Sequence, residues 1–315
     1  MVLPDKSMKP AAGKFAFDRI RATEGIVKAP KAPMCQLAAK RDCCGGKGYA
    51  LTTKGAYAHA ALCKCVKECP ACFGRARIVE GNNSKPCQLP PPNIVANLIN
   101  AAMIPARYAE ADLSKFTNYS GNAKEVLREI DKWKKNFKPS NANGLILSGP
   151  VGVGKTYMIT ALAKEFAERG LTVRFTDFFQ LLGELKAGFS EGKADHSQLA
   201  PLIEVDVLII DELGKGRNTE FELTVVDQLV CGRYNQNKSI IASTNYSLQG
   251  KGGDHIHQYN YNRPLDSKPG GGPGEFASDR FDSLESRVGG RIFSRLREMT
   301  SFLELTGDDY RRRDS

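Results

Sequence analysis

The feature that most constrains the fold is a glycine-rich segment of eight residues near the middle of the chain. An apolar segment, residues 144–148, precedes it, and an amphipathic segment that stops at Gly170 follows it. A strand that enters a glycine-rich turn and leaves it as a helix is the setting of a phosphate-binding P-loop. The sequence therefore predicts a strand, a tight loop and a helix over residues 144–169. The loop consists of Gly149, Pro150, Val151, Gly152, Val153, Gly154, Lys155 and Thr156.

These eight residues also have the chemistry of a nucleotide site. The glycines allow successive backbone N–H groups to point inward and form a cradle for phosphate at a helix N-terminus. In the pattern G-x-x-x-x-G-K-[ST], Lys155 reaches the β- and γ-phosphates and the Thr156 hydroxyl is a ligand for Mg²⁺. ATP and Mg²⁺ are therefore the expected ligands of this loop.

Short apolar segments alternate with amphipathic ones through the second part of the chain. Strands that are apolar throughout are buried on both faces, which indicates a parallel sheet covered by helices. The predicted fold class is α/β, a parallel sheet flanked by helices. The expected strands are 144–148, 171–175, 205–210, 239–243 and 301–305, and the expected helices are 156–169, 178–185, 220–234 and 284–299.

Polar residues follow two of the buried strands. Asp211 and Glu212 come directly after one, and Asn245 comes after another. Because the carboxyl ends of parallel strands meet at one edge of a sheet, Asp211 is predicted to bind Mg²⁺ together with Thr156. Glu212 is the candidate base for the attacking water, which predicts an ATPase that forms ADP and phosphate. The Asn245 amide is expected to hold the same water against the γ-phosphate.

Together with an arginine-bearing helix near the C-terminus, these motifs resemble the AAA+ ATPases. Within them the similarity is greatest to the DnaC/DnaI bacterial helicase loaders and the related IstB transposition ATPases, over about residues 104–311. The segments that carry the resemblance are Ile104-Pro105-Ala106-Arg107-Tyr108 with Phe116, Ile209-Ile210-Asp211-Glu212-Leu213-Gly214, Arg291-Ile292-Phe293-Ser294-Arg295-Leu296 and Gly307-Asp308-Asp309-Tyr310-Arg311.

The resemblance implies roles for further residues. It places Tyr108 near the adenine, and it makes Arg295 an arginine finger that reaches the ATP of a neighbouring subunit. ATP-dependent self-association follows from such a finger. It also places Arg311 on the γ-phosphate. An insertion rich in Gly and Pro before the arginine helix departs from the family pattern, so Arg287 and Arg291 stay open as alternatives for the finger.

Seven of the nine cysteines lie between Cys35 and Cys72. Cysteines beside tight glycine turns are typical of zinc knuckles, in which two thiolates point at one tetrahedral metal. Metal binding then supplies the stability that a small segment with little apolar mass lacks. The predicted Zn²⁺ ligands are Cys44, Cys65, Cys69 and Cys72, with Cys35, Cys43 and Cys63 as substitutes.

Composition divides the chain into three parts. Residues 1–33 mix Lys, Ala, Gly and Pro without periodicity and are expected to form a disordered basic lead. Residues 34–89 are the expected zinc-binding domain, and residues 90–315 the ATPase domain, with a flexible insertion over 249–283. Residues 1–90 carry 16 Lys and Arg against 6 Asp and Glu, whereas the rest carries 29 of each. This basic excess suits nucleic acid or an acidic protein partner.

The resemblance implies a function in DNA replication: loading the replicative hexameric helicase onto single-stranded DNA. The zinc-binding domain would contact the helicase, and the helix around residues 178–189 would face the DNA. An IstB-like helper ATPase that binds DNA and regulates a transposase is the alternative, because it shares the same core. A third hypothesis is a zinc-bearing nucleic-acid-binding module whose ATPase is a slow assembly switch. No stretch approaches the roughly 18 apolar residues of a membrane span, so the expected location is cytoplasmic, with no membrane contact.

Overall fold

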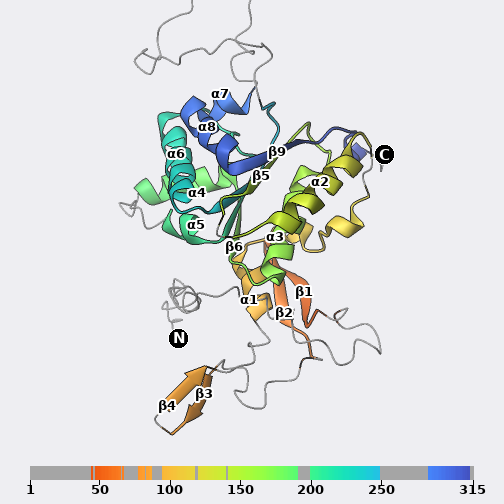
Figure 1. The fold of residues 1–315 in the computed structure, drawn as a ribbon, viewed down its shortest axis with the longest axis vertical. Coiled ribbons are helices and arrows are strands. Elements are labelled where there is room, and N and C mark those ends of the chain that lie inside the picture. Colours follow the sequence, from red (N-terminus) through yellow and green to blue (C-terminus); the bar gives the residue numbers. More distant parts are fainter. Residues whose placement is uncertain are drawn as a thin grey trace, which may run out of the picture.

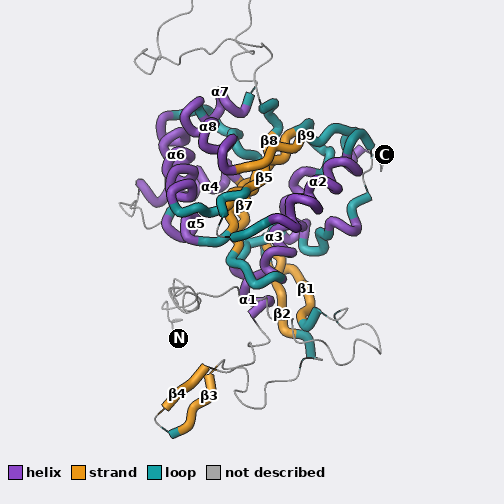
Figure 2. The backbone as a smooth tube through the Cα atoms, viewed as in Figure 1, coloured by secondary structure: helices purple, strands orange, loops and turns teal. Residues whose placement is uncertain are grey.

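The centre of the molecule is a five-stranded sheet with helices on both faces (Figure 1, Figure 2). The computed structural model describes residues 44, 47–64, 66, 77–81, 83–86, 94–117, 120–139, 141–190, 199–248 and 283–312. The strand order is β6-β7-β8-β5-β9, and every neighbouring pair is parallel. The predicted α/β fold is confirmed. The strands are β5 (Gly144–Ser148), β6 (Val173–Asp177), β7 (Val207–Asp211), β8 (Ser239–Thr244) and β9 (Thr300–Glu304).

Alternate side chains of β5 enter two separate hydrophobic cores. Leu145 and Leu147 belong to the core on one face of the sheet, and Ile146 belongs to the core on the other. Successive side chains of a strand point to opposite faces, so a wholly apolar strand supplies both layers. The first core is covered by α1 (Ile94–Ala101), α2 (Ala123–Asn136) and α3 (Lys155–Glu168), and the second by α4 (Phe178–Ser190), α5 (Ala200–Glu204), α6 (Glu220–Asn235), α7 (Leu284–Val288) and α8 (Gly290–Met299).

Local signals explain where several helices begin and end. Helix α3 starts directly after Gly154, whose φ of 107° is accessible to glycine. At the start of α6, the Thr219 hydroxyl accepts from the Glu222 amide at 3.3 Å and the Glu222 carboxylate accepts from the Thr219 amide, a capping box. The single helix predicted over 284–299 is wrong, because Gly289, with a φ of 84°, divides it into α7 and α8.

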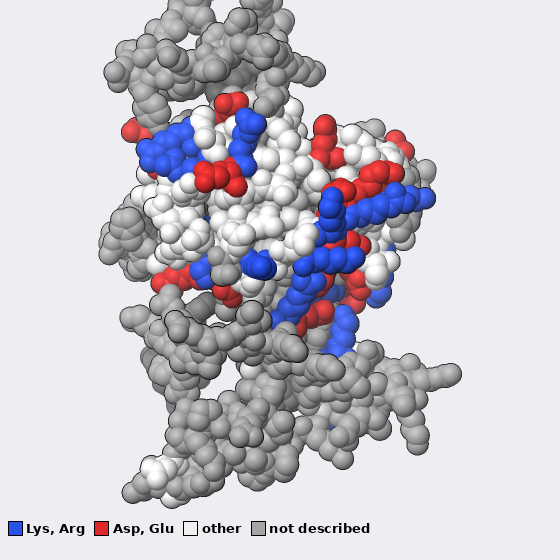
Figure 3. Space-filling model, viewed as in Figure 1, with Lys and Arg blue, Asp and Glu red and all other residues white. Residues whose placement is uncertain are grey.

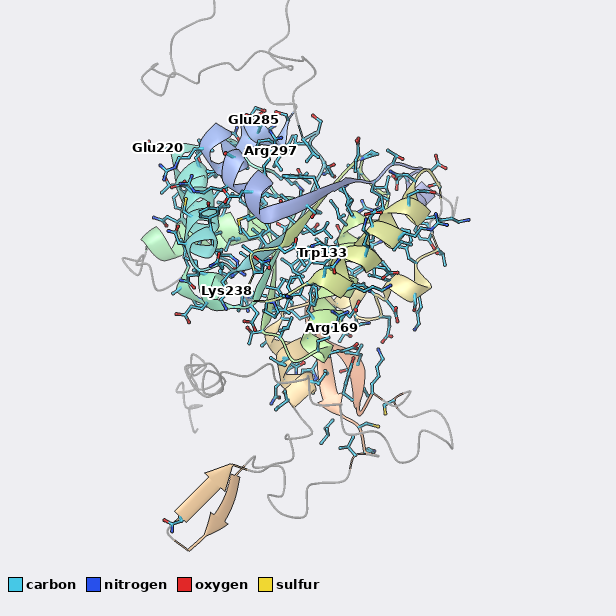
Figure 4. All side chains as sticks on the ribbon, in the orientation of Figure 1. Trp133, Arg169, Glu220, Lys238, Glu285 and Arg297 are labelled. Atoms are coloured by element: carbon cyan, nitrogen blue, oxygen red, sulfur yellow. The ribbon has the colours of Figure 1, made fainter. Side chains whose placement is uncertain are left out.

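Helices α1, α2 and α5 were not predicted. Helix α2 has a buried face that includes Ile130 and Trp133, the latter labelled in Figure 4. The Trp133 ring lies 5.9 Å from that of Phe166 on α3, edge to face. The solvent side of the same two helices is charged, and Figure 3 shows Lys and Arg interspersed with Asp and Glu there. Lys134 connects the helices, since its Nζ lies 2.9 Å from a carboxylate oxygen of Glu165.

A hairpin of β1 (Tyr49–Lys54) and β2 (Tyr57–Leu62) packs against α1. The Ala58 amide donates to the Ile104 carbonyl at 2.7 Å, and the Asn100 side chain binds both backbone groups of Ala60, at 2.7 and 2.9 Å. Tyr49 is buried in the same core as α1 and α3. The predicted division at residue 90 therefore does not separate two hydrophobic cores, because this hairpin buries its apolar side against the sheet domain. A second hairpin joins β3 (Arg77–Glu80) and β4 (Asn83–Pro86).

The predicted basic lead over residues 1–33 and residues 249–282 of the predicted insertion lie outside the described residues. In the part of the chain that the structure describes, no helix combines the length and the apolar character needed to cross a membrane.

Arg233 on α6 is fully buried and joins three elements at the amino edge of the sheet. Burial lowers the pKa of this guanidinium to about 9, so it remains charged at neutral pH. Its partners are backbone carbonyls at the end of α5, before β7 and at the start of β8. Its nitrogens donate, over 2.7–3.2 Å, to the carbonyl oxygens of Leu202, Ile203, Val205, Asp206 and Ser239.

Arg233→Met should destabilise the protein strongly, because methionine fills much of the volume but leaves the buried carbonyls without a donor. Each unsatisfied buried group costs about 1–3 kcal/mol, so we expect a loss of at least about 3 kcal/mol. Thermal unfolding measures it, as a fall of about 10 °C in the midpoint. Arg128→Met, on the exposed side of α2, is the matched control and should change the midpoint by less than about 2 °C. Equal midpoints for the two variants would contradict the structural role of Arg233.

Candidate nucleotide-binding site

The P-loop leaves β5 at the carboxyl edge of the sheet and leads directly into α3 (Figure 1). Gly149 and Gly152 have φ values of 144° and 86°, in the region that favours glycine. A β-carbon at Gly149 would overlap the Leu305 carbonyl, and one at Gly152 would overlap the Asp309 carboxylate. The loop therefore needs these glycines both for its backbone conformation and for the close approach of the C-terminal segment.

Lys155 is only 6% exposed, and its ammonium group is held by the P-loop itself. The Nζ atom donates to the carbonyls of Gly149, at 2.8 Å, and Pro150, at 2.7 Å. Burial lowers the pKa of Lys155 to about 8; the charge of Arg311 acts in the same direction and that of Asp211 opposes it. A phosphate oxygen is a stronger partner for an ammonium group than a neutral carbonyl, so Lys155 can exchange these carbonyls for phosphate.

Asp211, at the end of β7, contacts the start of α3. The Thr156 hydroxyl donates to Asp211 Oδ1 at 3.0 Å, and the Ser243 hydroxyl donates to the same oxygen. Burial raises the pKa of Asp211, whereas these two hydrogen bonds lower it. Mg²⁺ prefers oxygen ligands, and a hydroxyl and a carboxylate in contact suit it. The structure thus brings the two predicted Mg²⁺ ligands together.

Glu212 lies in a tight turn directly after Asp211. Its φ of 56° is uncommon for a residue with a side chain, and such conformations gather at functional sites. The Glu212 amide donates to the Ser243 hydroxyl at 3.0 Å, and its carboxylate forms an ion pair with Lys215. The hydrogen bond to Glu212 raises the pKa of Lys215. Ser243 therefore holds both acidic residues, since it donates to the carboxylate of one and accepts from the amide of the other.

The C-terminal segment after β9 covers the P-loop from one side. The Leu305 amide donates to the Ser148 carbonyl at 2.8 Å, and the Tyr310 amide donates to the Gly152 carbonyl at 3.0 Å. Arg311 follows, and it lies close enough to Lys155 for its charge to lower the pKa of that lysine. The residue predicted to sense the γ-phosphate therefore lies beside the P-loop.

The segment before α2 packs against both the P-loop and the C-terminal segment. The Phe116 ring packs against Gly154, where a β-carbon would meet it at 2.6 Å. The Tyr157 hydroxyl donates to the Asp112 carbonyl at 3.0 Å and accepts from the Asp112 amide at 3.1 Å, which fixes the segment to α3. Tyr108 lies in the same segment, in a short 3₁₀ helix, and is half-buried. Its contact with adenine stays a prediction.

Asn245 and Arg295 are placed differently from the residues above. Asn245 is exposed just beyond β8, two residues after Ser243. Arg295 is on α8, where its guanidinium lies over the ring of Tyr234 on α6, 5.8 Å from the ring centroid. That contact joins two helices of the second core and does not involve a residue of the P-loop. The predicted roles of Asn245 as a sensor and of Arg295 as a finger therefore stay predictions.

Two of the predicted zinc ligands are described, and both lie at the base of the β1–β2 hairpin. The Cys44 thiol accepts from the Gly48 amide at 3.3 Å, and the Cys63 amide donates to the Gly48 carbonyl at 3.0 Å. Among the described residues, no three possible ligands form a group that could hold a metal. The other predicted zinc ligands, Cys35, Cys43, Cys65, Cys69 and Cys72, lie outside the described residues.

A family model of IstB-like ATP binding proteins matches residues 94–252, which is half of the chain. The chain belongs to this family. The match includes the P-loop, Asp211 and Asn245, and it confirms the resemblance inferred from the sequence motifs.

Two curated relatives are similar over shorter segments. The replicative helicase loader DnaC of Escherichia coli (strain K12) is 25% identical over 137 residues, which are 42% of this chain and 56% of DnaC. The protein named Rv3427c in an insertion sequence of Mycobacterium tuberculosis is 33% identical over 104 residues, which are 32% of this chain and 40% of that protein. This chain thus spans about half the length of the curated relatives it matches. The crystal structure of the DnaC helicase loader is 28% identical, covers 64% of this chain and 99% of that one, and gives a TM-score of 0.49.

Several residues of the site were not identified from the sequence. Ser243 carried a signal, because a hydroxyl group inside an otherwise apolar buried strand needs a hydrogen-bond partner. Lys215 and Tyr157 carried none, since a lysine after a turn and a tyrosine on an amphipathic helix are ordinary surface and packing residues. Their partners became visible only when the loop and the helix were in place.

Ser243→Ala should weaken the binding of Mg²⁺ to the ATP site, because Asp211 loses a buried hydrogen bond that orients its carboxylate. Hydrogen bonds to charged groups contribute about 1.5–3 kcal/mol, so the half-saturating Mg²⁺ concentration should rise about tenfold or more. Binding of a fluorescent ATP analogue, titrated with Mg²⁺, measures the change. Ser239→Ala is the control, since it removes a buried hydroxyl at the other end of the same strand and should leave the titration unchanged. Identical Mg²⁺ titrations for the two variants would show that Ser243 does not act on Asp211.

Proposed function

We propose that this protein is an ATPase that delivers a replicative hexameric helicase to single-stranded DNA. The observation that carries the ATPase part is the convergence of Lys155, Thr156 and Asp211 at one edge of the sheet. The loader part is supported by the similarity to the helicase loader DnaC and by the family match. A cytoplasmic location suits both parts.

Each residue of the site has its own role in the proposed hydrolysis of ATP. P-loop amides bind the phosphates, and Lys155 exchanges the carbonyls of Gly149 and Pro150 for phosphate oxygens. Thr156 and Asp211 would hold Mg²⁺, which neutralises charge on the phosphates when bound. Glu212 takes a proton from the attacking water, the new bond forms to the γ-phosphorus, and the bond to the β-phosphate oxygen breaks.

Residues outside the P-loop complete the proposed mechanism. Asn245 holds the attacking water, Arg311 binds the γ-phosphate, and Tyr108 contacts the adenine. Arg295 reaches the γ-phosphate bound by a neighbouring subunit, which couples turnover to self-association. An arginine in this role can raise the rate by about 10³–10⁵. For α4 the proposed contact is with single-stranded DNA; the exposed side chain of Phe179 on this helix is able to stack on bases.

A transposition helper that binds DNA and regulates a transposase is the second candidate. It is favoured by the similarity to a protein of an insertion sequence and by the family match. Both candidates use the same nucleotide site, so the partner protein distinguishes them.

Glu212→Gln should bind ATP normally and lose at least about 100-fold of the turnover, because the amide keeps the size of the side chain but cannot accept the proton. Lys155→Ala should lose ATP binding. With ATP present, immobilised Glu212→Gln protein should therefore retain the replicative helicase from a native lysate, and Lys155→Ala protein should not. Recovery of a transposase would favour the second candidate, and recovery of neither partner would argue against both.

We also propose a zinc centre in residues 34–89, with Cys44, Cys65, Cys69 and Cys72 as ligands. Cysteine thiolates suit Zn²⁺, and the hydrogen bond from the Gly48 amide to the Cys44 sulfur is the kind that stabilises a thiolate ligand. When bound, zinc would add stability to the cysteine-bearing segments next to the β1–β2 hairpin. The attachment of the β1–β2 hairpin to α1 would connect this centre to the ATPase domain.

Cys44→Ser should reduce the zinc content from about one atom per chain to well below that, because a serine hydroxyl is a poor ligand for Zn²⁺. Elemental analysis of protein purified without chelator measures it. Cys231→Ser is the matched control, since Cys231 lies on α6 and its thiol donates to Asp227 at 3.2 Å. An absence of zinc in the parent protein would contradict the proposal.

A further inference from the structure

Helices α6 and α8 lie side by side on the second core, and several of their side chains contact each other. In Figure 4, Glu220 lies at the start of α6, Lys238 lies between the end of α6 and β8, and Arg297 lies on the neighbouring α8. Asp227 and Tyr234 are seven residues apart on α6, and so are Arg291 and Glu298 on α8. Residues seven apart lie on the same side of a helix, two turns from each other. Across the two helices Asp227 faces Arg291 and Tyr234 faces Glu298, so the helices run in the same direction and in register.

Two arginines of α8 have different kinds of partner on α6. Arg291 is directed at a carboxylate, with Nε 3.8 Å from Asp227 Oδ1. Arg295 has an aromatic partner: its guanidinium lies over the Tyr234 ring, and its Nη1 donates to the Arg291 carbonyl at 3.3 Å. Tyr234 is itself oriented, because its hydroxyl donates to Glu298 at 2.9 Å, a bond that raises the pKa of the phenol.

Arg287 is held in another place. Its guanidinium lies 4.6 Å from the ring centroid of Tyr246 and donates to the Gly216 carbonyl at 3.1 Å. Both partners belong to loops that follow strands of its own subunit. Three arginines are candidates for the arginine finger. Of these, Arg295 is the one whose guanidinium lies on an aromatic ring at the α6–α8 surface, and it has no carboxylate partner among the described ion pairs.

We propose that Tyr234 is a positioning residue for Arg295. The inference rests on the proposed function, in which Arg295 acts on the ATP of a second copy of this chain. The ring of Tyr234 supports the flat face of the guanidinium, and the N–H groups that do not bond to the Arg291 carbonyl are available to bind the γ-phosphate of the neighbour. The hydrogen bond to Glu298 orients the phenol, so the guanidinium of Arg295 has a fixed support before the subunits meet. A side chain ordered in advance loses less entropy on binding.

A mixing experiment separates this role from a general effect on folding. One subunit type, the donor, carries Lys155→Ala and so has an empty site and an intact finger. The other, the acceptor, carries Arg295→Ala and has an intact site and no finger. ATP hydrolysis by the mixture then comes only from interfaces in which the donor supplies Arg295. Tyr234→Ala is placed in the donor in one mixture and in the acceptor in another.

In the donor, Tyr234→Ala should slow the mixture about two- to five-fold, the factor that corresponds to an exposed cation–π contact. In the acceptor, the same substitution should leave the rate unchanged, because the acceptor supplies no finger. Tyr234→Phe in the donor keeps the ring and should stay within about two-fold of the unsubstituted mixture. Tyr246→Ala in the donor removes the ring under Arg287 and should have no effect.

An equal loss from Tyr234→Ala in donor and acceptor would overturn the inference, because it would mean a structural role. An unchanged or increased rate of ATP hydrolysis with Tyr234→Ala in the donor would overturn it too. An increased rate would mean that Tyr234 keeps Arg295 from reaching the neighbouring site. In both cases the finger itself stands, because the unsubstituted mixture still turns over. If Arg295→Ala alone hydrolyses ATP at the parent rate, or if the unsubstituted mixture is inactive, then the finger fails and this inference fails with it.

Discussion

The Asp211 carboxylate joins three segments that are far apart in the sequence. It ends β7, accepts from Thr156 at the start of α3, and accepts from Ser243 in β8. The arrangement depends on the register between the strands, in which Ile210 pairs with Ala242, so that the next residues, Asp211 and Ser243, come together at the carboxyl edge. A shift of either strand by one residue would turn its side chain, Asp211 or Ser243, to the opposite face and separate the two. The packing of the two cores on this sheet therefore also sets the geometry of the nucleotide site.

Two buried cations mark the opposite edges of the sheet, and backbone carbonyls stabilise both. Arg233 at the amino edge has five carbonyl partners from three elements, so moving it would disrupt the fold. Lys155 at the carboxyl edge has two, both from the P-loop, and an anion can replace them. The difference follows from the number of partners, because each buried group left unsatisfied adds to the free-energy cost. One edge of the sheet is fixed, and the other can exchange ligands.

Strand β9 connects the two arginines for which a role in catalysis is proposed. It pairs with β5, the strand that leads into the P-loop, along its whole length. Helix α8 with Arg295 precedes β9, and the segment that covers the P-loop and ends near Arg311 follows it. A single strand thus fixes the position of Arg295 relative to the nucleotide site of the same chain. The proposed self-association and nucleotide binding would share this strand, which suits the proposed ATPase whose turnover depends on assembly.

The sequence by itself determined the P-loop, the buried parallel strands and the acidic residues at the end of β7. These features depend on residues next to one another in the chain, on hydrophobic periodicity and on the backbone conformations that only glycine adopts easily. Only the tertiary structure decided that Ser243 holds Asp211, that Arg233 binds the ends of three elements, and that the β1–β2 hairpin belongs to the core of the sheet domain. It also decided that Gly289 interrupts the arginine-bearing helix and that Tyr234 lies under Arg295. These contacts join residues that are distant in sequence, and a local pattern does not specify which distant groups satisfy a buried hydrogen bond or support a guanidinium.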